Sequence, residues 1–152
     1  MNRHLVKTFL GIALVLGASS AMAQEGEALT KQIDYRQAVM EVFSWNLSAM
    51  GDTVKGEVPY DKASFERHAQ DLASATRLDV LKGFPDDSVS DDSDAKDEIW
   101  LQWNEFADKF RALQDEAAKL AEVSASGDIE KIKGQFKETA GTCKACHKAF
   151  KK

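Results

Sequence analysis

Residues 99–120 read IWLQWNEFADKFRALQDEAAKL, and this stretch decides the fold class. Its large apolar side chains and one alanine are separated alternately by four and three residues; they are Ile99, Trp103, Phe106, Phe110, Leu113, Ala117 and Leu120. This spacing places side chains on one face of an α-helix, because the helix turns once every 3.6 residues. The stretch therefore predicts a long amphipathic helix, which we expect to begin near Asp94 with that side chain as its N-cap.

Three other segments carry the same helical pattern. The first runs from about residue 29 to 55 and stops at Gly56; its apolar stripe is Ile33, Met40, Phe43, Leu47, Met50 and Val54. The second follows Pro59 and Asp61, carries Phe65, Ala69, Leu72 and Ala75, and ends at Lys82, Gly83 and Pro85. The last follows the turn at residues 126–128; its inward positions are Ile129, Ile132, Phe136, Ala140, Cys143, Cys146, His147 and Phe150. No strand pattern or repeat is visible, so the chain is predicted to be all-α, an antiparallel four-helix bundle.

The connection at residues 86–94 is rich in Asp and Ser. It lacks the glycine and the terminal glutamate of an EF-hand calcium loop. We therefore expect a solvated linker between the second and third helices rather than a calcium site.

Residues 1–23 have the composition of a secretory signal peptide. Arg3 and Lys7 precede an apolar run that is too short to cross a bilayer, and residues 21–23 read AMA, a small-x-small cleavage site. We expect cleavage after Ala23, one domain over residues 24–152, and export to the periplasm. The mature chain then has 18 basic and 25 acidic residues, a net charge of about −7. This balance argues against nucleic acid and anionic membranes as partners, and weakly favours a basic or weakly charged partner.

The only two cysteines stand in the sequence CKACH, residues 143–147. Two thiols one helical turn apart, followed by a histidine, match the attachment site of a c-type haem. In this interpretation both thiols reach the vinyl groups along one side of the porphyrin, and His147 binds the iron. The alternatives are a periplasmic copper or zinc protein that uses Cys143, Cys146 and His147, a dithiol redox site, and a structural disulfide.

The sequence resembles the class II c-type cytochromes, and most closely the cytochrome c′ family. The resemblance covers residues 24–152 and is carried by CKACHKAFKK, YRQAVM, VKGEVPYD and EIW. It implies one covalent haem c, with Cys143 and Cys146 as thioethers and His147 as the proximal axial ligand of the iron. It also implies a basic residue near that histidine, at Lys151, an Arg36–Gln37 pair against the haem and its propionates, and Met40 on the distal side.

Two of these positions carry a physical question. Arg36 lies on the apolar stripe, where an unpaired guanidinium is costly, so it either pairs with a propionate or extends to water. Met40 is either the sixth iron ligand or a filler of the distal pocket. His68, on the second helix, is expected to be a helix-face histidine rather than a ligand.

The resemblance implies electron transport by single electrons, binding of NO or CO, or both. We expect no enzyme activity, because no acid–base group accompanies the motif. A second stripe on the first helix consists of Ala38, Val42, Trp45 and Ala49. It indicates either a homodimer through the first helices or a Trp45 folded over the second helix.

Overall fold

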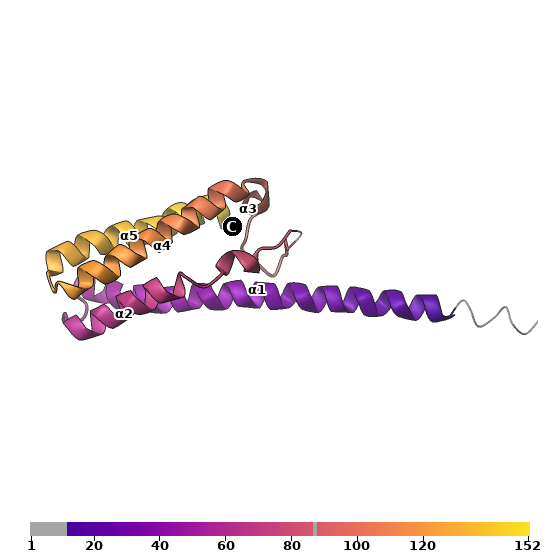
Figure 1. Ribbon diagram of the computed structural model, residues 1–152, viewed down its shortest axis with the longest axis horizontal. Helices are drawn as coiled ribbons and strands as arrows, with labels where there is room; N and C mark the ends of the chain where they lie inside the picture. Colours follow the sequence, from indigo (N-terminus) through magenta and orange to yellow (C-terminus); the bar gives the residue numbers. More distant parts are fainter. Residues whose placement is uncertain (1–11, 87) are drawn as a thin grey trace, which may run out of the picture.

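The computed structural model describes residues 12–86 and 88–152, so the predicted basic start of the leader, with Arg3 and Lys7, lies outside it. The elements are α1 (Ile12–Lys55), α2 (Lys62–Ala75), the 3₁₀ helix η1 (Val80–Gly83), α3 (Glu98–Leu101), α4 (Trp103–Ala125) and α5 (Ile129–Phe150). Figure 1 shows α1, α2, α4 and α5 running in alternating directions as a bundle. The all-α four-helix bundle predicted from the stripes is confirmed.

The helix boundaries follow local chemistry. α1 continues unbroken through the predicted cleavage point to Lys55, and Gly56 then adopts a positive φ of 81° that ends the helix. Asp61 caps α2 by accepting a hydrogen bond from the Ser64 amide at 2.6 Å. In the part of the chain described, no helix is long and apolar enough to cross a membrane.

The predicted third helix is wrong at its start. Asp94 is not a cap; a single turn, α3, comes first, and the chain breaks at Gln102 with φ −125° and ψ 43°. The reason is a competing partner, since the Lys96 amide donates to the Phe150 carbonyl at 3.0 Å and the Lys152 amide donates to the Asp94 carbonyl at 2.8 Å. We call this pairing of residues 94–96 with residues 150–152 the terminal clamp.

The break moves one side chain, Trp103, out of the predicted stripe and leaves Leu101, which was not part of the stripe, at the surface. Trp103 is 36% exposed and Leu101 is 81% exposed. The rest of the stripe is buried as predicted: Ile99, Phe106, Phe110, Leu113, Ala117 and Leu120.

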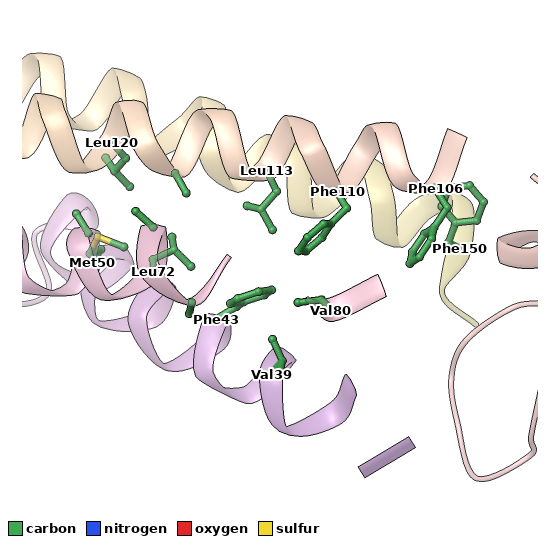
Figure 2. Close-up of a cluster of buried hydrophobic side chains, with 14 of the residues drawn as sticks. Val39, Phe43, Met50, Leu72, Val80, Phe106, Phe110, Leu113, Leu120 and Phe150 are labelled. Atoms are coloured by element: carbon green, nitrogen blue, oxygen red, sulfur yellow. The ribbon is translucent and has the colours of Figure 1, made fainter. Parts of the chain in front are cut away.

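The core differs between the two ends of the bundle. At the end where the α4–α5 turn lies, Met50, Leu72, Leu120 and Ile132 are completely buried. Figure 1 shows the α4–α5 pair diverging from α1 toward the opposite end, which holds α3 and the C-terminus. There the buried side chains of Figure 2 include Val39, Phe43, Val80, Phe106 and Phe150. We call the end with the α4–α5 turn the closed end, and the end with α3 and the C-terminus the open end.

The Asp/Ser-rich connection is only partly the solvated linker that was predicted. Asp91, Asp92 and Asp94 are exposed, but Ser88 is 1% exposed and Ser93 is also buried. The Trp100 indole nitrogen donates to the Pro85 carbonyl at 2.8 Å, which holds the start of the connection against α3. The connection therefore packs onto the open end of the bundle.

Candidate functional site

The cysteine motif lies in the last turns of α5. Asp128 caps the start of this helix, and the Lys151 amide closes its end by donating to the His147 carbonyl at 2.9 Å. Cys143 and Cys146 are half-buried and carry free thiols, whereas His147 is exposed. All three side chains line the same hollow, as the helical register predicted.

That hollow has a volume of about 410 Å³ and lies between α1 and α5. Its apolar wall is built from four separate elements and consists of Met40, Phe43, Leu47, Val80, Phe106, Phe110, Leu113 and Phe136. A second hollow of about 730 Å³ adjoins it, lined by residues that include Arg36, Gln37, Phe84, Ile99 and Phe150. Met40, Phe106, Cys146 and His147 line both, so the two hollows meet at these four side chains. Volumes of this size are typical of ligand and cofactor sites.

Burial sets the protonation of the motif. It raises the pKa of the Cys143 thiol, and it raises the pKa of Cys146, with the neighbouring Cys143 adding to the effect. Burial lowers the pKa of His147, and the nearby positive charge of Lys151 lowers it further. At neutral pH the thiols are therefore protonated and the imidazole is neutral, which is the form that binds a metal.

Arg36 does not extend to water, because its side chain is only 3% exposed. Its guanidinium donates to the Gly83 carbonyl at 3.3 Å and, at 3.1–3.3 Å, to the carbonyl and hydroxyl oxygens of Ser88. It lies 4.8 Å from the centre of the Phe84 ring, and burial lowers its pKa. Its Nε atom is buried without an acceptor among the described residues. Arg36 is also one of the residues that line the second hollow, and a carboxylate bound there would be a suitable partner for its unsatisfied donor.

The other α1 positions are placed as follows. Gln37 is exposed at the rim of the second hollow and donates to the Asp92 carbonyl at 3.1 Å. Met40 is half-buried and lies on α1 at the junction of the two hollows. His68 lines neither hollow; its Nδ1 lies 2.9 Å from the Oδ1 atom of Asn46, so it is a helix-face histidine that links α2 to α1.

Three features of the site were not predicted from the sequence. Val80 reaches the first hollow from the short η1 helix, and Ser88 and Phe84 hold Arg36 from about fifty residues away. Lys151 lies near His147 as expected, and it also forms an unpredicted ion pair with Asp94, at 3.4 Å, within the terminal clamp. The burial of Ser88 has no local sequence signal, because other serines and aspartates of the same loop are exposed or only partly buried.

The residues present fit a covalently held haem. Two thiols lie one turn apart beside a neutral imidazole, the adjoining hollow is apolar, and a buried guanidinium has a free donor. Cys143 and Cys146 would hold the macrocycle, His147 would bind the iron, and Arg36 would meet a carboxylate. Among the side chains that the structure describes, no group of three His, Cys, Asp or Glu residues is arranged as a metal site.

Known proteins agree with this fit. The family model described as "Cytochrome C'" matches residues 31–151. Cytochrome c′ of Alcaligenes xylosoxydans xylosoxydans is 31% identical over 120 residues, which cover 79% of this chain and 92% of that protein. Cytochrome c-554 of Cereibacter sphaeroides is 26% identical and covers 93% of this chain and 94% of its own length.

Solved structures extend the agreement to three dimensions. Cytochrome c prime from Shewanella frigidimarina superposes with a TM-score of 0.79 at 35% identity, covering 82% of this chain and 96% of that one. A nitric oxide complex of a mutant cytochrome c prime from Alcaligenes xylosoxidans superposes with a TM-score of 0.75 at 30% identity, covering 82% of this chain and 95% of that one. The chain belongs to the cytochrome c′ family.

Proposed function

We propose that this cytochrome c′-family chain is a periplasmic haem protein that binds NO or CO and exchanges single electrons. Members of the family carry one covalently attached haem c. The observation that carries the proposal is that Cys143, Cys146 and His147 line a largely apolar hollow that Met40 also lines. A haem held by these residues would supply a redox-active iron, and Met40 would line the pocket beside it.

The distal side suits small neutral gases. Phe43, Leu47 and Val80 line the first hollow together with Met40, so this part of its wall consists of hydrocarbon. Such a pocket accepts NO and CO, whereas bound dioxygen is stabilised by a donor. The Alcaligenes xylosoxidans relative has been solved as a nitric oxide complex, which supports the same ligand for this chain.

We propose no enzymatic turnover. Arg36 is engaged by Gly83 and Ser88, and His68 lines neither hollow. Neither side chain is positioned as a distal acid or base, which peroxide chemistry would need.

The test of the proposal uses protein exported from a host that matures c-type cytochromes. We expect haem that stays with the polypeptide after denaturation, and a Soret band that shifts when NO is added to the ferrous protein. An exported protein without covalent haem contradicts the proposal, and reconstitution by copper or zinc alone supports the alternative.

Whether Met40 binds the iron distinguishes a gas-binding protein from a six-coordinate electron carrier. We propose that the Met40 thioether leaves the sixth position open, which predicts a high-spin ferric spectrum that is unchanged in Met40→Leu. A low-spin spectrum with the charge-transfer band of Met ligation, lost in Met40→Leu, would instead establish a six-coordinate electron carrier.

We propose a homodimer through the outer face of α1. Trp45 is 73% exposed, so the prediction that it folds over the second helix is wrong. Val42 and Tyr35 are exposed on the same helix, and this apolar surface favours a self-contact. Sedimentation of wild-type protein should give a dimer and Trp45→Glu a monomer with an unchanged Soret band; a wild-type monomer contradicts it.

Export is proposed from the leader composition. Intact-mass measurement of the periplasmic protein should place the mature N-terminus at Gln24. A mass that retains residues 1–23 would contradict the cleavage.

A further inference from the structure

The charges of this chain are segregated along the sequence and in space. Residues 129–152, which form α5 and its end, contain seven lysines and two glutamates. Residues 24–128 contain 11 basic and 23 acidic residues. The helix that carries the cysteine motif is thus about +5, whereas the remainder of the mature chain is about −12.

Three of these lysines form one row. Lys137, Lys144 and Lys148 are spaced by seven and four residues, so they share one face of α5, and all three are exposed. The row spans about 16 Å along the helix. We call it the lysine stripe.

The stripe is free of internal partners. Lys131 and Lys133 pair with Asp128 and Glu130, but no described carboxylate lies within ion-pair distance of the three stripe lysines. Its charge is therefore directed at solvent, where it attracts anions within a Debye length.

The stripe lies beside the exposed part of the cofactor site. Lys144 precedes His147 by three residues and Lys151 follows it by four, so both are its neighbours on the helix surface. His147 is exposed and lines both hollows. An electron that enters or leaves past this edge on the side of the stripe passes the basic surface of α5.

We propose that the lysine stripe docks an acidic face of a redox partner protein at the His147 edge of the site. The proposal rests on the proposed electron exchange, and it reverses the expectation of a basic or weakly charged partner that the net charge alone gave. A stripe about 16 Å long fits the small, charged interfaces of transient electron-transfer complexes. A flat anionic membrane fits it less well, because the acidic surface outside α5 would be repelled as contact spread.

The first experiment measures binding to the haem-loaded protein without any redox step. The probe is an oligoglutamate peptide of about ten residues, titrated at low salt while amide chemical shifts are followed. The stripe variant is Lys137→Glu/Lys144→Glu/Lys148→Glu, and the matched control is Lys62→Glu/Arg67→Glu/Arg77→Glu. The control has the same change in net charge but lies on and just after α2, which packs on α1 and α4 rather than on α5.

We expect shifts confined to α5, abolished in the stripe variant and retained in the control. The proposal is overturned if the stripe variant and the control lose peptide binding equally, or if the wild-type protein does not bind the peptide. Binding to phosphatidylglycerol vesicles without binding to the peptide overturns it in favour of a membrane surface. The same three positions changed to Gln should bind the peptide with an affinity between those of the wild type and the Glu variant. This Gln variant replaces the Glu variant in the test if the Glu variant does not fold.

The second experiment measures electron transfer. Hexacyanoferrate(III) takes one electron from the ferrous protein and becomes hexacyanoferrate(II), while the protein becomes ferric. If the stripe governs approach, raising the salt from about 10 to about 150 mM slows this reaction about three- to tenfold despite the negative net charge. In the stripe variant, added salt should speed the reaction, whereas in the control variant it should still slow it. The proposal is overturned if added salt speeds the reaction of the wild-type protein.

The two experiments separate the two proposals. Protein without covalent haem would contradict the proposed function, while the peptide titration would still report on the stripe. A normal Soret band with no response to the stripe variant would leave the haem function intact and remove the docking surface.

Discussion

The closed and open ends of the bundle use the same helices in different ways. At the closed end, Met50, Leu72, Leu120 and Ile132 are fully buried against one another. At the open end, the hollows of about 410 and 730 Å³ separate α1 from the α4–α5 pair. At the closed end the side chains alone fill the core, whereas the open end has apolar walls that fit a large flat group.

The comparison shows where the cofactor contributes to stability. A void lined by apolar side chains forfeits their packing energy, so a group that fills it acts as part of the core. Substitutions at the closed end should therefore act on the polypeptide alone, and substitutions at the open end should act through the bound group.

The largest effect is expected from Cys143→Ser/Cys146→Ser, which removes the covalent attachment. Loss of the group would leave the open end unfilled, and we expect the free energy of unfolding to fall by about 5 kcal/mol or more. Denaturant titration followed by circular dichroism measures it, with the Soret band as the check on haem. Unchanged stability without haem would show that the open end packs by itself.

Leu120→Ala should break the closed end. Leu120 has no exposed surface, so we expect a loss of about 2–5 kcal/mol with the Soret spectrum unchanged. Leu101→Ala is the matched control, because that side chain is 81% exposed and its loss should change stability by less than about 0.5 kcal/mol. A Soret change in Leu120→Ala would mean that the two ends are coupled.

Arg36→Met should act at the open end by a smaller amount. It removes the donors to Gly83 and Ser88 and leaves their buried acceptors unpaired, at a cost of about 1–3 kcal/mol. Residues 83–88 should then become more susceptible to proteolysis. The exposed Arg67→Met should have no such effect, and equal susceptibility in both variants would remove the role assigned to Arg36.

The smallest effect concerns pH. Lys119 and then Gln135 hydrogen-bond to the Glu116 carboxylate and lower its pKa. A carboxyl with a depressed folded pKa stabilises the protein fully above its unfolded pKa of about 4.3, and this contribution is lost as pH falls through the folded value. Glu116→Gln should therefore remove less than about 1 kcal/mol near pH 7 and little at low pH, because the pair is at the surface.

Unfolding midpoints measured from pH 7 down to acid would test this difference. Glu122→Gln removes an exposed carboxylate from the same helix and is the matched control for the change in net charge. An equal loss from Glu116→Gln at every pH would mean that the carboxylate charge is not responsible.

The sequence was most informative where side-chain spacing is local. The stripe from Phe106 to Leu120 and the shared inward face of Cys143 and Cys146 both follow from the helix period, and the structure has both. The prediction was wrong at the start of the third helix, where Asp94 has a high intrinsic propensity to be an N-cap. Its carbonyl is instead taken by the Lys152 amide, a partner that lies 58 residues later in the chain.

The environment of Arg36 could not be predicted from the sequence either. Its stripe position raised the question of a partner, but the acceptors come from η1 and the following connection. Only the packing of that connection onto α1 brings Ser88 to the guanidinium. The exposure of Trp45 likewise depends on which face of α1 the other helices cover.

The start of α1 has a practical consequence. Among the described side chains, the first that is buried is Ile33, which is 5% exposed. If the leader is removed after Ala23, about nine residues, or about 14 Å of helix, stand ahead of the core. An affinity tag, a fluorophore or a tether to an electrode placed there should leave the bundle and its cofactor site undisturbed.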